Sequence, residues 1–115
     1  MNSACACGVM NDADIGALRQ DMPDSELFDI SALLFKALSD PTRAKIIWAL
    51  DRTELCVGNL SALLGMTQSS ISHQLAGLRA AGIVTARKSG KEVFYSLADH
   101  HIREIFEAGM EHAKE

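Results

Sequence analysis

The spacing of small and apolar residues between positions 60 and 78 constrains the fold of this chain more than any other feature of its sequence. Ser61 is small, Gly65 follows four residues later, and Ile71 lies six residues beyond that glycine. Two helices that cross at a small side chain need a glycine in the left-handed turn between them and an apolar anchor in the second helix. The segment therefore predicts a helix-turn-helix.

The remaining pattern predicts a mainly α-helical protein with one small β-hairpin. Apolar residues that recur at steps of three and four indicate amphipathic helices, and Asp40 before Pro41 is typical of a helix start. Two short alternating segments on either side of Ser89-Gly90 indicate a hairpin. We expect helices over about residues 25–38, 41–50, 57–64, 68–82 and 99–115, and strands over about residues 83–87 and 92–97. A helix-turn-helix followed directly by such a hairpin is a winged helix.

With 115 residues the chain has the size of one domain. Residues 1–24 lack helical periodicity and are rich in Asp, Asn, Gly and Ala, so we expect a mobile tail with at most one weak helical turn there. Residues 25–115 are expected to form the winged helix-turn-helix domain. Neither a membrane-spanning apolar run nor an export signal is evident, which favours a cytoplasmic protein.

The charge is unevenly distributed along the chain and favours nucleic acid as a partner of the middle segment. The net charge is −4 overall, but residues 36–95 carry +4, between −5 on residues 1–35 and −3 on residues 96–115. Short polar side chains at the start of the second helix of the motif suit base edges and phosphates in a major groove: Gln68, Ser69, Ser72 and His73. Basic side chains on the hairpin suit the adjacent phosphates: Arg87, Lys88 and Lys91. A polar helix face that is merely solvated is the alternative, and the basic hairpin argues against it.

The sequence as a whole resembles the ArsR/SmtB family of metal-responsive winged-helix repressors. The resemblance is carried by ELCVGNLSALLGMTQSSISHQLAGLRAAGIVTARKSGKEVFYSL, with LSDPTRAKIIWAL before it and DHHIREIFEAGMEHAKE after it. It implies a homodimer, joined through its terminal helices, that binds double-stranded operator DNA. It also implies that a metal ion acts as inducer and releases the protein from the operator.

The last helix carries a candidate metal site that a single chain cannot complete. His101 and His112 lie 11 residues apart, so they share one helix face but are separated by about 16 Å along the axis. Bonds from zinc to its ligands are only about 2 Å long, whereas two antiparallel copies of the helix could bring His101 of one chain near His112 and Glu115 of the other, with Asp99 completing four ligands. The resemblance implies the same ligands, Asp99, His101, His112 and Glu115, and a Zn(II) sensor. Chance clustering of surface residues is the alternative.

The cysteines suggest a second site for a softer ion. Cys56 lies in ELCVGNL, which resembles the ELCVCDL segment of family members that sense arsenic, cadmium or lead, but Gly58 replaces the second cysteine. Cys5 and Cys7 of the partner chain could join Cys56, and three thiolates favour Cd(II) or Pb(II) over zinc. Alternatively, Cys56 is a small buried apolar residue and the Cys5-Ala6-Cys7 segment is solvated.

These features favour a metal-sensing repressor over other classes of function. An enzyme is not expected, because no phosphate-binding glycine loop or oxyanion-building turn accompanies Cys56. A metal buffer would not need the polar helix face or the basic hairpin. A repressor that responds to oxidation through its thiols is the nearest alternative.

Overall fold

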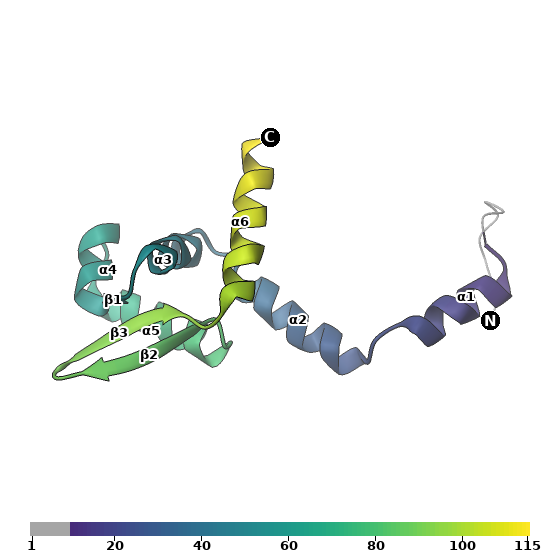
Figure 1. Ribbon diagram of the computed structural model, residues 1–115, viewed down its shortest axis with the longest axis horizontal. Coiled ribbons are helices and arrows are strands. Elements are labelled where there is room, and N and C mark those ends of the chain that lie inside the picture. Colours follow the sequence, from purple (N-terminus) through teal and green to yellow (C-terminus); the bar gives the residue numbers. More distant parts are fainter. Residues whose placement is uncertain (1–9) are drawn as a thin grey trace. The chain divides into compact units, whose positions relative to one another are not determined.

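The computed structural model describes residues 10–115, and the chain divides between Ser31 and Ala32 into two compact units. The first unit contains helix α1 (Asp12–Asp21) and the start of α2 (Ser25–Ala37). The second unit contains the end of α2 and every element after it. Figure 1 labels these elements along the chain.

Helix α1 corrects the expectation of at most a weak turn before residue 25. It is ten residues long and begins with a capping box. The Asn11 side chain accepts from the backbone N–H of Asp14 at 2.9 Å, and the Asp14 carboxylate accepts from the backbone N–H of Asn11 at 3.4 Å. These bonds satisfy N–H groups that a helix start leaves unpaired. The Asn and Asp residues that suggested a loop therefore act as a helix start.

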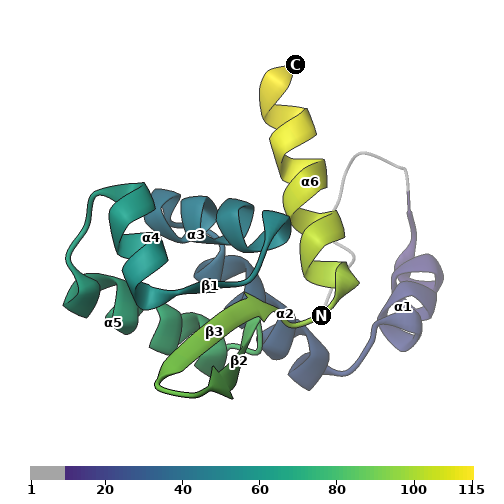
Figure 2. The same ribbon diagram turned by 60° about the vertical axis from the view of Figure 1, so that its left-hand side comes forward.

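The second unit confirms the mainly α-helical winged helix-turn-helix. Its elements after α2 are α3 (Pro41–Arg52), β1 (Leu55–Cys56), α4 (Val57–Leu64), α5 (Gln68–Ala80), β2 (Val84–Ser89), β3 (Glu92–Leu97) and α6 (His100–Lys114). Figure 2 shows α3 and α4 with α5 beneath them, and the hairpin of β2 and β3 extending beside α5. The core is apolar and its fully buried large side chains come from α3, α4, α5 and the start of the hairpin: Ile46, Ile47, Leu60, Ile71, Leu75, Leu78, Ile83 and Val84.

The turn between α4 and α5 has the features that its spacing predicts. Gly65 ends α4 with a φ of 66°, a left-handed conformation that favours glycine. The Ser61 hydroxyl donates to the carbonyl oxygen of Met66 and so closes the turn from the α4 side. Thr67 then caps α5, because its hydroxyl accepts from the backbone N–H of Ser70 at 3.1 Å.

The wing is a three-stranded antiparallel sheet with the order β1-β3-β2. Strands β2 and β3 pair from Val84 with Leu97 to Ser89 with Glu92, so β2 extends two residues beyond the expected strand. Strand β1 was not expected. It has only two residues, which pair with Tyr95 and Phe94, and so short a segment shows no alternation that could reveal it.

Candidate nucleic-acid interface and metal-binding residues

Helix α5 separates a buried face from an exposed polar face. Ile71, Leu75 and Leu78 are fully buried in the core. The four side chains expected to contact DNA are all exposed: Gln68, Ser69, Ser72 and His73. Their side chains make no hydrogen bonds to other residues within 10–115, so their donors and acceptors are available to a ligand. The structure therefore exposes this face of α5 as the sequence predicts. Helix α5 itself lies beside the hairpin of the wing (Figure 2).

The three basic residues of the wing are not equivalent. Lys88 and Lys91 are exposed, and neither forms an ion pair with another residue of the described chain. Arg87, in contrast, donates from Nη2 and Nε to the two carboxylate oxygens of Glu54 at 2.8 and 3.2 Å. Its guanidinium also lies 5.3 Å from the ring centroid of Phe94. Arg87 is thus already engaged, whereas both lysines remain available for phosphate.

The pair of Glu54 and Arg87 affects the ionisation of both groups. The hydrogen bond from Arg87, with a smaller contribution from its charge, lowers the pKa of Glu54 below its ordinary value of 4.5. The same contacts raise the pKa of Arg87. No local pattern in the sequence indicates Glu54, because 33 residues separate the partners and only the folded wing brings them together.

Two of the four expected zinc ligands lie together at the start of α6. Asp99 caps the helix, because its Oδ1 accepts from the backbone N–H groups of His101 and Ile102 at 2.9 and 3.3 Å. The same oxygen lies 3.4 Å from Nδ1 of His101, and both side chains are more than half exposed. An exposed imidazole beside a carboxylate is a nitrogen and oxygen donor pair of the kind that zinc accepts.

The other two expected ligands, His112 and Glu115, are exposed at the opposite end of α6. Within residues 10–115 of one chain, no three His, Cys, Asp or Glu side chains lie close enough to hold one ion. The structure therefore places two of the four residues at each end of α6, as the rise of the helix requires. His100, which is not an expected ligand, is exposed and its ring centroid lies 4.1 Å from that of His101.

Cys56 is neither fully buried nor isolated. It is half-buried and caps α4, because its sulfur accepts from the backbone N–H of Asn59 at 3.4 Å and lies 3.1 Å from the side-chain oxygen of the same residue. A β-carbon at Gly58 would lie 3.8 Å from this sulfur, an ordinary contact distance. A second cysteine at that position would therefore have room beside the first. Cys5 and Cys7 lie outside the described residues.

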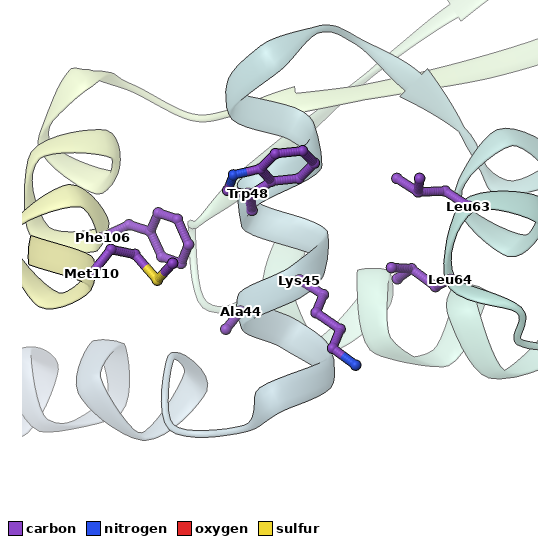
Figure 3. A pocket seen from close by; sticks show the side chains of 7 residues that line it. All are labelled: Ala44, Lys45, Trp48, Leu63, Leu64, Phe106 and Met110. Atoms are coloured by element: carbon purple, nitrogen blue, oxygen red, sulfur yellow. The ribbon is translucent and has the colours of Figure 1, made fainter. Parts of the chain in front are cut away.

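A pocket of about 260 Å³ lies over α3, between α4 and α6. Figure 3 shows Phe106 and Met110 of α6 on one side of α3, and Leu63 and Leu64 of α4 on the other. Trp48, the only tryptophan in the chain, lines this pocket from α3 and is 43% exposed. Its fluorescence should therefore be sensitive to changes in α6, because the emission of an indole depends on its surroundings.

The fold, the exposed polar helix and the basic wing define a winged helix-turn-helix DNA-binding protein. Residues 40–86 match the family described as bacterial regulatory protein, arsR family. A transcriptional repressor SmtB homolog of Synechocystis sp. is 39% identical over 101 residues, covering 85% of this chain and 76% of that protein. A homolog of the cadmium resistance transcriptional regulatory protein CadC from Staphylococcus aureus is 34% identical over 112 residues, covering 96% of this chain and 92% of that protein.

Two solved structures are similar to this chain in fold and in sequence. A homodimeric winged helix-turn-helix DNA-binding domain from Mycobacterium bovis matches with a TM-score of 0.75 and 27% identity, covering 81% of this chain and 88% of that one. HlyU from Vibrio cholerae matches with a TM-score of 0.69 and 34% identity, covering 74% of this chain and 92% of that one.

The chain belongs to the ArsR/SmtB family of winged-helix transcriptional repressors. Membership of a family of regulators confirms that it is not an enzyme. In residues 10–115 no helix is both long and apolar enough to cross a membrane.

Proposed function

We propose that this protein is a homodimeric repressor whose release from operator DNA is induced by a metal ion, with Zn(II) bound between the α6 helices of the two chains. The observation that carries the proposal is the division of four candidate ligands into two pairs on one helix. Asp99 and His101 lie together at its start, and His112 and Glu115 lie about 16 Å away along its axis. In an antiparallel dimer each pair faces the complementary pair, which gives two sites per dimer.

The terminal helices also have the apolar surface that such a dimer needs. Helix α2 exposes Leu27, Ile30, Leu33 and Phe35, each more than half exposed, and α6 exposes Met110. A single soluble chain rarely leaves this much large apolar surface uncovered, and such patches mark interfaces. The homodimeric state of the related domain from Mycobacterium bovis supports the same arrangement.

Helix α5 and the wing have different roles in DNA binding. The exposed side chains of Gln68, Ser69, Ser72 and His73 read base edges, because α5 presents them on the face opposite the core. Lys88 and Lys91 contact phosphate, which sets affinity and register but carries no sequence information. Two recognition helices read successive major grooves only if the dimer holds them about 34 Å apart.

Repression and release are coupled through the shape of the dimer. A bound ion would supply a charge and a fixed coordination geometry that join the two chains, and it would favour a dimer that no longer fits successive grooves. By linkage, DNA must then weaken metal affinity by the same factor, typically about 5- to 150-fold. Relatives that respond to metals support this role, among them the cadmium resistance regulator and an antimony-specific repressor that is 31% identical.

Cys56 supports a second candidate site, for Cd(II) or Pb(II), together with Cys5 and Cys7 of the partner chain. Cys56 is half-buried and lies in the same unit as the wing and α5. The alignment with the homolog of the cadmium resistance regulator covers 96% of this chain. A thiolate absorption band in the ultraviolet that disappears when residues 1–8 are deleted would support this site. A band that survives the deletion would contradict it.

The zinc site is tested by titrating the reduced protein with zinc while Trp48 emission and bound zinc are measured. We expect two ions per dimer and a change in emission at the same point. His101→Ala should remove both, whereas the control His100→Ala should keep both, because His100 is also exposed and is adjacent but is not a proposed ligand. Unchanged stoichiometry in His101→Ala would contradict the proposed site.

A further inference from the structure

Arg43 connects the first turn of α3 to the recognition helix α5. Its Nε donates to Oε1 of Gln74 at 2.8 Å, in a partly buried contact between residues 31 positions apart. The backbone N–H of Arg43 donates to the capping carboxylate of Asp40 at 3.1 Å, which holds the backbone of Arg43 in the first turn of α3. The interaction is directional and joins two elements of the same unit.

The guanidinium also lies close against the backbone of α5 at Gly77. A β-carbon at Gly77 would lie 3.1 Å from Nη2 and 3.7 Å from Cζ of Arg43. Gly77 has no left-handed conformation to explain it, and glycine inside a helix costs about 1 kcal/mol relative to alanine. The close approach of Arg43 is the physical reason for a small residue at this position.

Gln74 and Gly77 occupy a flank of α5 between its buried and exposed faces. Gln74 lies about 100° around the helix axis from His73 on one side and from Leu75 on the other. The opposite flank lies beside α4, where a β-carbon at Gly58 would be 3.8 Å from Nε2 of Gln68. Helix α5 therefore packs beside α4 on one flank and accepts a hydrogen bond from Arg43 on the other.

The bond from Arg43 adds a directional restraint to the apolar packing of α5. Apolar contacts along the buried face are non-directional, so they specify the rotation of α5 about its own axis less sharply than a hydrogen bond does. Such a rotation would move the side chains of Ser72 and His73 sideways relative to base edges, whose hydrogen bonds require good alignment. A hydrogen bond on the flank opposes this rotation directly.

We propose that Arg43 is a positioning residue that fixes the rotation of the recognition helix through Gln74 and thereby sets how well the protein discriminates among DNA sequences. The inference rests on the proposed DNA-reading role of α5 and adds a determinant of its specificity. Arg43 acts through α5 and not by contacting DNA. Loss of the pair therefore lowers sequence discrimination without changing the number of phosphate contacts.

The test compares the affinity of the full chain for two duplexes of equal length, one enriched from a random library by the wild-type protein and one of random sequence. Gln74→Leu removes the acceptor, keeps the charge of the protein and replaces a half-buried side chain by one of similar size. We expect the ratio of the two affinities to fall about 3- to 10-fold, the range for loss of one hydrogen bond. Binding to random DNA and its salt dependence should not change.

Further variants separate positioning from simpler roles. Arg43→Lys should lower the same ratio, because an ammonium lacks the planar fork of the guanidinium. In the double variant that combines Arg43→Lys with Gln74→Leu, the ratio should fall no further than in the more affected single variant. Gln74→Glu keeps the acceptor and should keep the ratio. The control Arg52→Lys, at the exposed far end of α3, should have no effect.

Three results would overturn the inference. The first is an unchanged ratio in Gln74→Leu, and the second is additive losses in the double variant. The third is an equal loss of affinity for both duplexes in Arg43→Gln, which removes the charge and would make Arg43 a phosphate contact. Failure of the wild-type protein to enrich any duplex would instead contradict the proposed DNA-reading role itself. A lower melting temperature with an unchanged ratio would show that the pair only stabilises the fold.

Discussion

The wing offers the sharpest quantitative prediction, because its cations differ in how they are already paired. Lys88 is exposed and unpaired in the described chain, whereas Glu54 occupies the guanidinium of Arg87 through two hydrogen bonds. Replacing either residue by alanine removes one positive charge per chain. Only Lys88→Ala is expected to remove a phosphate contact.

The size of the effect follows from the release of counterions. Each phosphate contact adds about −0.9 to the slope of log affinity against log salt concentration. When a dimer loses two contacts, this slope therefore becomes shallower by about 1.8. Over a fourfold change in salt, from about 50 to 200 mM, that difference corresponds to a factor of about 12 in affinity. Arg87→Ala should change the slope much less, and Glu54→Gln, which frees Arg87, should make the slope steeper.

Fluorescence anisotropy with a labelled duplex, repeated at several salt concentrations, measures these slopes. The same shift should appear with random DNA, because phosphate contacts carry no sequence information. An unchanged slope in Lys88→Ala, or equal changes in Lys88→Ala and Arg87→Ala, would refute the reasoning.

Two other predictions concern residues 54–58, which include the first turn of α4. The carboxyl group of Glu54 should titrate below its ordinary pKa of 4.5 in carbon-13 NMR and return toward that value in Arg87→Gln. Because the pKa of Glu54 is lowered in the folded state, the stabilisation from this pair is present above about pH 4.5 and is lost as the pH falls through the folded pKa. Identical titrations of Glu54 in the wild type and in Arg87→Gln would mean that the pair does not form in solution. Gly58→Cys should create a thiolate pair with Cys56 and give a cadmium absorption band even when residues 1–8 are deleted, while Gly58→Ser should not. No band in the cysteine variant would contradict the proximity of position 58 to the Cys56 sulfur.

The features that could be predicted from the sequence are those set by residues close together in the chain. The helix-turn-helix follows from Ser61, Gly65 and Ile71, which lie within eleven residues and whose roles depend on local geometry. The hairpin follows from Ser89-Gly90 and the alternation on either side. Helix α1 is an exception, because its capping box uses the same Asn and Asp residues that also occur in loops.

Interactions between distant residues were not predicted, because no local pattern encodes them. The pair of Glu54 and Arg87 depends on the short strand β1, and the pair of Arg43 and Gln74 depends on the crossing of α3 and α5. The candidate zinc ligands are predicted from helical spacing together with the family resemblance. They lie at the two ends of α6 because each residue of a helix adds about 1.5 Å of rise. Within residues 10–115 of one chain they therefore cannot bind the same ion.

The central claim is that an ion held by the α6 helices controls release from DNA. The most direct measurement is the affinity for the enriched duplex with and without zinc, for the wild-type protein, for His112→Ala and for the control His100→Ala. Zinc should weaken binding about 5- to 150-fold in the wild type and in His100→Ala, and should have no effect in His112→Ala, which should still bind the duplex without zinc. Equal weakening by zinc in the wild type and in His112→Ala would contradict the account and leave the cysteines as the candidate sensor.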